Sequence, residues 1–110
     1  MSIKYIGTVL LLFCLLACAK KAPIIPEVVL PIDEFSALMM DIRLAETNYK
    51  LLIRAGGASE NFLDSNYRLI YALHGVNTAQ VDTSFKWYSE HPALLKEVDQ
   101  QVLENFNRLQ

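Results

Sequence analysis

Apolar residues recur at alternating spacings of three and four along most of the chain, as they do in amphipathic helices. The first such stretch is expected to begin after Pro31, with the acid Asp33 as the cap or in the first turn. It is expected to end at the glycines at positions 56 and 57. The residues predicted to face the core are Phe35, Leu38, Ile42, Ala45, Tyr49 and Leu52.

Three shorter helices are expected to follow. The second runs from about Ser59 to His74 and stops at Gly75, the third has Asn77 as its N-cap, and the fourth begins at Pro92. Their expected core residues are Phe62, Leu63, Ile70 and Leu73, then Val81, Phe85 and Tyr88, then Leu95, Val98, Val102, Phe106 and Leu109. No segment alternates with period two for long enough to form a strand. The predicted fold is therefore all-α, a small bundle of three to four helices.

The N-terminal pattern differs from that of the helical domain. A charge-free apolar run at residues 6–17 follows Lys4 and is shorter than the about 20 residues that a spanning helix needs. It suits the apolar part of a secretory signal peptide. The run ends in Leu15-Leu16-Ala17-Cys18, which resembles the lipobox of bacterial lipoproteins. The resemblance implies cleavage between Ala17 and Cys18 and a lipid on the Cys18 thiol. The alternative is a buried N-terminal helix that happens to contain cysteine.

These features divide the chain into a lipoprotein signal peptide at 1–17, a lipidated cysteine with a Pro-rich tether at 18–31, and a helical domain at 32–110. Proline at three tether positions favours extended backbone. The last tether residues, Val28, Val29 and Leu30, are apolar, and the end of this run is expected to pack onto the domain. Ala19 after the cysteine implies, by resemblance to other lipoproteins, the periplasmic face of the outer membrane.

Composition excludes several classes of function. With 110 residues the chain holds one small domain, and its formal charge of −2 leaves no basic excess for a nucleic-acid backbone. The two histidines, His74 and His91, lie in different segments, so no metal site is predicted, and no cofactor motif is present. At 53 % hydrophobic residues the chain is expected to fold.

Several short motifs lie in a fixed order along the predicted domain. They are Leu30-Pro31 leading into Phe35 and Met39 to Ala45, then Tyr67-x-x-Ile70-x-x-x-His74-Gly75-Val76, then Asp82-x-Ser84-x-x-Trp87-Tyr88, and Pro92. Over residues 28–110 the chain resembles a family of short Bacteroidota lipoproteins known as domain of unknown function 4296. The resemblance implies an envelope location and a helical fold, but no reaction or ligand. More weakly, the motifs resemble the helical N-terminal part of periplasmic peptidyl-prolyl isomerase chaperones.

No catalytic residue is predicted. Ser84 and His91 lie seven residues apart and would share a helix face only if one helix ran through Pro92. Ser84 is therefore expected to be a hydroxyl on a helix surface. Acidic pairs such as Asp41 with Glu34 are expected to be ordinary solvated charges. We expect the protein not to be an enzyme.

A second apolar stripe on the first helix is the main candidate for function. Ala37, Met40, Leu44 and Leu51 lie roughly 140° around the helix from the predicted core stripe. This stripe is either covered within the domain or free to bind a partner. On the third helix, Trp87 lies about 120° from the Phe85 and Tyr88 face and either packs over the fourth helix or stands exposed. The predicted partner surface is Met40, Leu44, Leu51 and Trp87.

Three hypotheses about function follow from these features. The first is a lipid-anchored, non-catalytic, periplasmic interaction module, a subunit or adaptor that binds a protein of an envelope complex. The second is a holdase-like periplasmic chaperone for unfolded outer-membrane proteins. The third is a hydrolase that uses Ser84 or an acidic pair.

Overall fold

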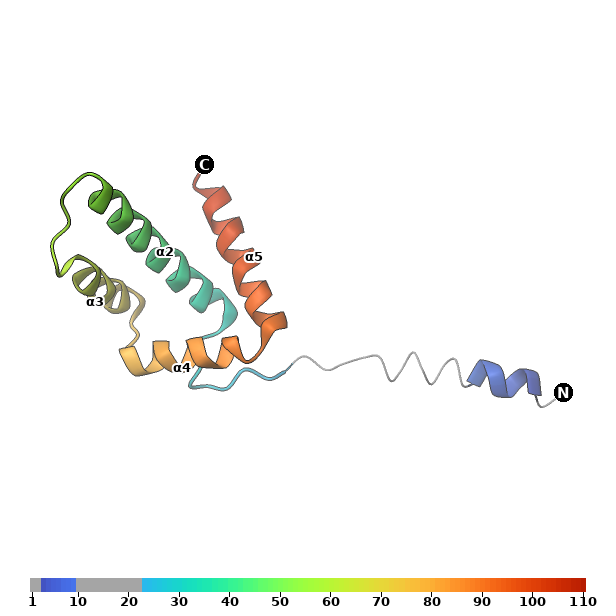
Figure 1. Ribbon diagram of the computed structural model, residues 1–110. Helices are drawn as coiled ribbons and strands as arrows, with labels where there is room; N and C mark the ends of the chain where they lie inside the picture. The colour runs from blue at the N-terminus through green and yellow to red at the C-terminus, as the bar shows by residue number, and fades with distance from the viewer. Residues whose placement is uncertain (1–2, 10–22) are drawn as a thin grey trace.

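The computed structural model describes residues 3–9 and 23–110 of the chain. Residues 3–9 form a short helix, and the domain consists of α2 (Ile32–Arg54), α3 (Phe62–His74), α4 (Thr78–Ser89) and α5 (Pro92–Arg108) (Figure 1). No strand is present in the described ranges. The prediction of an all-α bundle is confirmed, with four helices after the tether. The predicted cleavage and lipidation residues, Ala17 and Cys18, lie outside the described residues.

The longest helix, α2, is the centre of the domain. It packs against α5 on one side and α3 on another, and α4 lies across the foot of the bundle, where it contacts α5 (Figure 1). An aromatic cluster joins α2 to α4. The Phe35 ring stacks on the ring of Tyr88 at a centroid distance of 4.6 Å and meets Phe85 edge-on at 5.2 Å. These stacked and edge-on arrangements are the favourable geometries for aromatic pairs.

Most predicted core positions are buried or half-buried. The buried apolar residues are Val29, Leu30, Phe35, Leu38, Ile42, Ala45, Ile70, Val81, Tyr88, Leu94, Val98 and Val102. The expectation that the end of the tether packs onto the domain is confirmed, because Val29 and Leu30 belong to this core. Leu94 was not among the predicted residues; it lies in the first turn of α5.

Three predicted core leucines are exposed, as is Phe85, and for these four residues the prediction is wrong. Leu52, Leu73 and Leu109 each lie in or just beyond the last turn of a helix. For Leu52 and Leu109 the reason is that the helices diverge, as Figure 1 shows for the upper ends of α2 and α5. Leu73 lies beside His74, which still contacts α2, and is exposed on a side of α3 that no other helix of the described domain covers. Helical periodicity identifies the side of a helix that faces the core, but not how far the neighbouring helix extends along it.

The helix ends follow local chemistry. Both α2 and α3 stop at a glycine in the left-handed region, Gly56 with φ of 90° and Gly75 with φ of 65°. Only glycine adopts this conformation without strain. Asn77 caps α4, since its Oδ1 accepts a hydrogen bond from the Gln80 N–H at 2.8 Å. The start of α3 was predicted at Ser59 but lies at Phe62, because Ser59 instead accepts the Phe62 N–H in a turn at 3.1 Å.

Candidate interaction surface

Ser84 is not the surface hydroxyl that the sequence predicted. It is completely buried, and its Oγ accepts the backbone N–H of Leu30 at 2.9 Å. The same hydroxyl donates to the carbonyl of Gln80 at 2.8 Å. One turn further along α4, the Tyr88 hydroxyl donates to the Leu30 carbonyl at 2.7 Å. The two side chains form a clamp that satisfies both backbone groups of Leu30 where the chain enters the core.

The clamp leaves no reactive hydroxyl on Ser84, since its proton and a lone pair are both in use. Burial also raises the pKa of the Tyr88 phenol. The ring of His91 does not face Ser84; its Nδ1 lies 2.7 Å from the Trp87 carbonyl oxygen. Because α4 ends at Ser89, His91 lies beyond the helix that carries Ser84, as the N-cap of α5, and the two residues form no serine–histidine pair.

We expect Ser84→Ala to lower the free energy of unfolding by about 1–3 kcal/mol, because the buried Leu30 N–H loses its acceptor. Urea unfolding followed by circular dichroism measures this change. Ser89→Ala is the matched control: Ser89 also bonds back to a carbonyl of α4, that of Lys86, but on the exposed surface. Its effect should stay within about 0.5 kcal/mol. Equal effects of the two substitutions would contradict the clamp.

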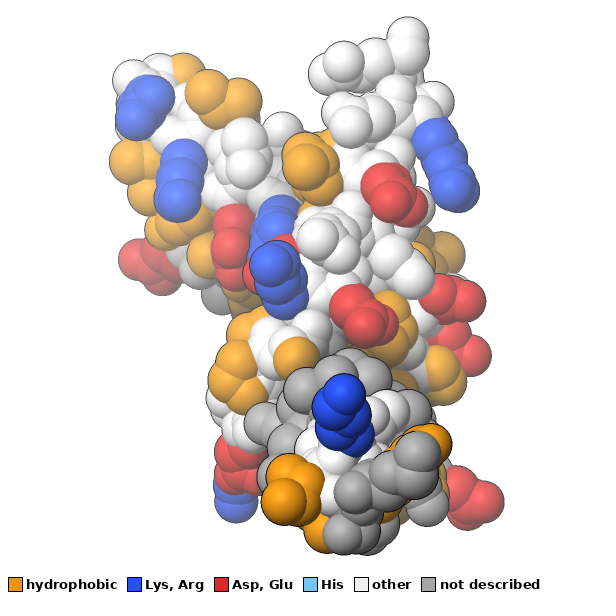
Figure 2. Space-filling model, turned by 90° about the vertical axis from the view of Figure 1, so that its right-hand side faces the viewer, with side chains coloured by type: hydrophobic (Ala, Val, Ile, Leu, Met, Phe, Trp, Pro, Cys, Tyr) orange, Lys and Arg blue, Asp and Glu red, His pale blue; other side chains and the backbone are white. Residues whose placement is uncertain are grey.

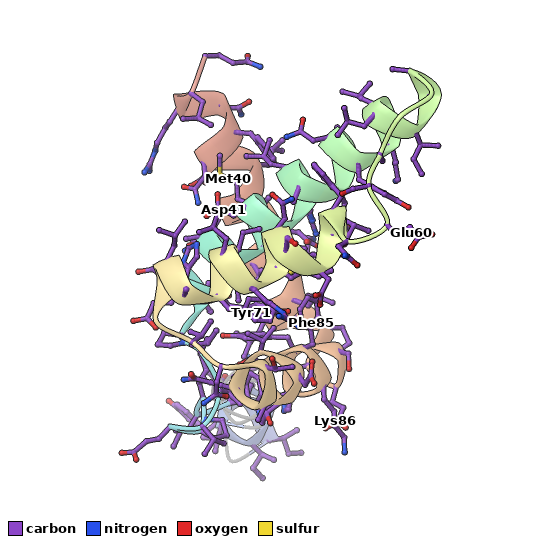
Figure 3. All side chains as sticks on the ribbon, turned by 90° about the vertical axis from the view of Figure 1, so that its left-hand side faces the viewer. Met40, Asp41, Glu60, Tyr71, Phe85 and Lys86 are labelled. Atoms are coloured by element: carbon purple, nitrogen blue, oxygen red, sulfur yellow. The ribbon has the colours of Figure 1, made fainter. Side chains whose placement is uncertain are left out.

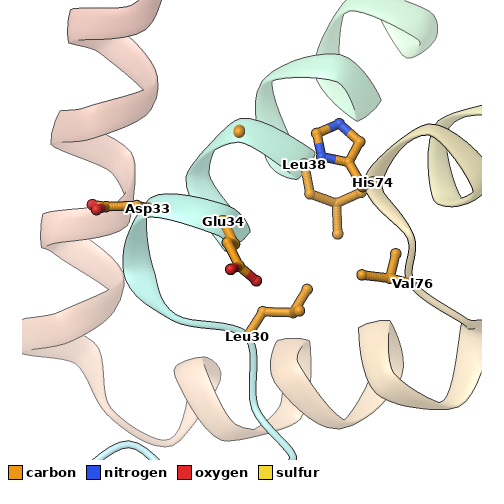
Figure 4. Close-up of a pocket in the computed structure, with 7 residues that line it drawn as sticks. Leu30, Asp33, Glu34, Leu38, His74 and Val76 are labelled. Atoms are coloured by element: carbon orange, nitrogen blue, oxygen red, sulfur yellow. The ribbon is translucent and has the colours of Figure 1, made fainter.

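A shallow hollow of about 340 Å³ lies between the start of α2 and the end of α3 (Figure 4). Its floor is apolar, formed by Leu30, Leu38 and Val76, and the carboxylate of Glu34 points into it. At the rim, the Nε2 of His74 lies 2.6 Å from the Asp41 carboxylate, which ties α3 to α2. Asp41 is therefore not the ordinary solvated charge that the sequence predicted, because its carboxylate is engaged by His74.

The hollow offers limited chemistry. Its lining contains carboxylates and an imidazole but no hydroxyl or thiol to act as a nucleophile. Another polar contact between the same two helices is the hydrogen bond from the Tyr67 hydroxyl to Glu46 at 2.9 Å. Burial and this bond raise the pKa of Tyr67 to about 12, so the phenol stays protonated. In residues 3–9 and 23–110 no three potential ligand side chains gather as a metal site would need.

Polar contacts, as well as buried apolar residues, show which sides of α2 pack against α5 and α3. Toward α5, Arg43 forms an ion pair with Asp99 at 2.8 Å. The Ser36 hydroxyl donates to the Ile32 carbonyl of its own helix at 2.6 Å and also lies 3.4 Å from the Val98 carbonyl oxygen of α5. Toward α3 lie the contacts of Asp41 and Glu46 described above, and the ring of Tyr49 stacks on Phe62. One side of α2 remains between these two sets of contacts.

We call this remaining side the α2 outer side; it carries Ala37, Met40, Leu44 and Leu51, about 140–200° around the helix from Phe35. Met40 is half-buried and packs against the core. Leu44 is 38 % exposed and Leu51 is 55 % exposed. The two interpretations of this stripe thus each hold for part of it: Met40 is covered within the domain, and the two leucines are not.

Ala37 lies at the lower end of the α2 outer side, with a hollow on each flank. One is the hollow beside His74, and the other, of about 430 Å³, lies between α2 and α5. The second hollow is polar, and its lining residues are Asp33, Ala37, Gln101, Glu104, Asn105 and Arg108. Figure 4 shows the Asp33 side chain turned away from Leu38 toward α5. The small Ala37 side chain leaves both hollows open to an approaching chain.

The four residues of the predicted partner surface do not come together as one patch. Met40 and Leu44 are neighbours on α2, as their spacing requires. Leu51 lies two turns further on, roughly 10 Å along the axis, beyond the exposed polar residues Thr47 and Asn48. Trp87, on α4, is half-buried and stacks on the ring of His91 at a centroid distance of 3.9 Å. The interpretation in which Trp87 packs at the start of α5 is the one that the structure supports.

Sequence reasoning missed the clamp and the His74–Asp41 contact. The sequence did single out the residues involved, since the short motifs include Leu30, His74, Ser84 and Tyr88. The residues that they contact lie 33 to 58 positions away along the chain, so the pairs became visible only in the folded domain.

Comparison with known proteins gives one match. No curated protein and no solved structure matches the chain. None of the helices in the described ranges has the length and apolar character that crossing a bilayer requires. A family model described as "Domain of unknown function (DUF4296)" matches residues 26–110, which include the clamped segment and all four helices of the domain. The chain therefore belongs to the DUF4296 family.

Proposed function

We propose that the protein is a lipid-anchored, non-catalytic interaction subunit of a cell-envelope complex. Cys18 carries the lipid, the segment at 19–28 is the tether, and the domain binds its partner through the lower part of the α2 outer side. The single observation that carries the proposal is the exposure of Leu44 on a helix whose other sides are already occupied by α3 and α5.

The chemistry of this surface favours a helical partner. Leu44 offers an apolar contact, and half-buried Met40 beside it has a flexible thioether side chain that adapts to different shapes. The adjoining hollow between α2 and α5 offers two carboxylates, two amides and one guanidinium. An amphipathic partner helix would place an apolar residue on Leu44 and polar residues in the hollow.

Two contacts are the reason that the proposal assigns no catalytic role to Ser84 or Asp41. The Ser84 hydroxyl is buried in the clamp, and the Asp41 carboxylate is held by His74. Both groups therefore have structural roles that account for them. A hydrolase would need a nucleophile that is free to reach a substrate.

We expect Leu44→Glu to weaken partner binding by roughly 30-fold or more, the effect of losing about 2 kcal/mol at an interface hot spot. A photo-crosslinking amino acid at position 44, followed by mass spectrometry of the membrane fraction, identifies the partner, and the glutamate variant then tests the contact. Met40 is avoided because it packs on the core, so a charge there would unfold the domain.

Leu103→Glu is the matched control, since Leu103 is an exposed leucine on α5 away from the α2 outer side. It should leave capture of the partner unchanged. If Leu44→Glu retains capture while circular dichroism shows a folded domain, the proposed surface is wrong.

A second candidate function is the holdase-like chaperone. The observation in its favour is the number of exposed apolar side chains on several helices, among them Leu69, Leu73, Leu103 and Leu109. Such a surface binds many unfolded chains weakly. In the crosslinking experiment it would give many outer-membrane proteins in place of one, and the protein would suppress their aggregation at stoichiometric amounts.

A further inference from the structure

The last residues of α2 expose apolar side chains in several directions at once. Leu51 is 55 % exposed, Leu52 is 38 % exposed and Ile53 is 53 % exposed. Because consecutive residues of a helix lie about 100° apart, these three cover about 200° of its circumference. We call residues 50–54 the α2 tip. An uncovered helix face would expose a single apolar stripe. The end of α2 is instead apolar on most sides.

The α2 tip is also positively charged. Lys50 and Arg54 are both exposed and lie one turn apart on the same side of the helix, between the directions of Ile53 and Leu51. Within residues 23–110 neither forms an ion pair. No acid occurs from position 47 to position 59, and Figure 3 shows the next acid, Glu60, where the loop returns toward α3. Figure 2 shows this end of the molecule as one of two arms, with orange and blue side chains at its extremity.

We propose that the α2 tip docks on the surface of an anionic phospholipid bilayer, with Leu51, Leu52 and Ile53 among the headgroups and upper acyl chains. A protein groove accepts one stripe of a helix, whereas a bilayer interface accepts apolar side chains on all sides of an inserted end. The two cations lie where they meet anionic headgroups. Each cation near such a surface strengthens binding by about fivefold.

The position of the clamp makes this contact reachable from the lipid anchor, a step that rests on the proposed function. Since Val29 and Leu30 are fixed in the core, residues 19–28 separate the anchor from the domain and span at most about 35 Å. The clamp lies at the start of α2 and the tip at its end, about 34 Å away. Because the two lengths are about equal, the tip reaches the anchor's own leaflet even when α2 stands upright, with its start away from the membrane and its end toward it. The lipid anchor raises the effective concentration of the domain at the membrane surface, so even a weak contact between the tip and the bilayer is populated.

The test measures the depth of the tip with a single indole. The full chain, purified from membranes, is placed in vesicles of phosphatidylglycerol and phosphatidylcholine brominated on its acyl chains, because bromine quenches only an indole that enters the bilayer. The reporter chain carries Trp87→Phe with Ile53→Trp, and the control chain carries Trp87→Phe with Leu103→Trp. We expect strong quenching and a blue shift for the substitution at 53 and neither for that at 103.

Charge provides the second measurement. Lys50→Gln with Arg54→Gln in the reporter chain should lower the ratio of inserted to free tip by about 25-fold, the product of the two cation contributions. Vesicles of phosphatidylcholine alone should weaken insertion similarly. Leu44→Glu should leave the quenching unchanged, because the partner surface lies elsewhere on α2. A failure of the proposed partner contact is thus distinguishable from a failure of the membrane contact.

Three results would overturn the proposal. The first is equal quenching at positions 53 and 103, the second is quenching that does not respond to the two glutamine substitutions, and the third is a photo-crosslink from position 53 to a protein in place of lipid. If the chain isolated from membranes carries no lipid on Cys18, it is added in solution to the same vesicles at rising vesicle concentration. The quenching at positions 53 and 103, and the effect of the two glutamine substitutions, then test the membrane contact independently of the proposed anchor.

Discussion

Phe35→Ala should lower the free energy of unfolding by about 3–5 kcal/mol, the range for removing a fully buried phenylalanine. Phe35 is 1 % exposed, and its ring packs between Tyr88 and Phe85, so its removal opens a cavity where α2 meets α4. A domain of this size has a total stability on the order of 5–10 kcal/mol. Thermal and urea unfolding of the variant should show a large loss of stability or no cooperative transition.

Phe85→Ala provides the comparison, since Phe85 belongs to the same aromatic cluster but is 40 % exposed. Its removal leaves a notch open to water, and we expect a loss of about 1 kcal/mol. If the two variants lose equal stability, the cluster is not packed as the structure shows. If the loss for Phe35→Ala is small, the core does not depend on the contact between α2 and α4.

Cys18→Ser should abolish lipid attachment completely. A cysteine thiol is the nucleophile that accepts the diacylglyceryl group, and a serine hydroxyl remains protonated and far less reactive. Each buried methylene of an acyl chain contributes about 0.8 kcal/mol, so losing two or more chains removes the anchor. Labelling cells with an alkyne fatty acid, followed by membrane fractionation, measures both effects.

Cys14→Ser is the matched control because Cys14 lies inside the predicted signal peptide, four positions before Cys18. This variant should keep the lipid label, and mass spectrometry should find a mature chain that begins at Cys18. Label retained by Cys18→Ser, or lost from Cys14→Ser, would refute the lipobox interpretation and with it the anchor in the proposed function.

The sequence by itself determined the elements of the domain. Apolar spacing of three and four located all four helices after Pro31, and Gly56, Gly75, Asn77 and Pro92 marked their ends. These features are predictable because helix formation and capping depend on residues within about four positions of one another. The apolar end of the tether likewise indicated, correctly, that Leu30 joins the core.

The tertiary structure alone decided what several side chains do. Ser84 was expected on the surface, but the Leu30 backbone, 54 positions earlier, covers it and uses its hydroxyl. His74 engages Asp41, a residue 33 positions away on another helix. Such contacts depend on the packing of helices against one another, and no local pattern encodes them.

The same reason explains the outcome for the candidate surface. Periodicity placed Met40, Leu44 and Leu51 on one side of α2, but the positions of α3 and α5 decided which of them stay exposed. Leu51 and Leu52 were predicted on different sides, and both became part of the exposed α2 tip because the helices diverge toward their free ends. Periodicity gives the direction of a side chain about the helix axis, whereas its burial depends on where the neighbouring helices end.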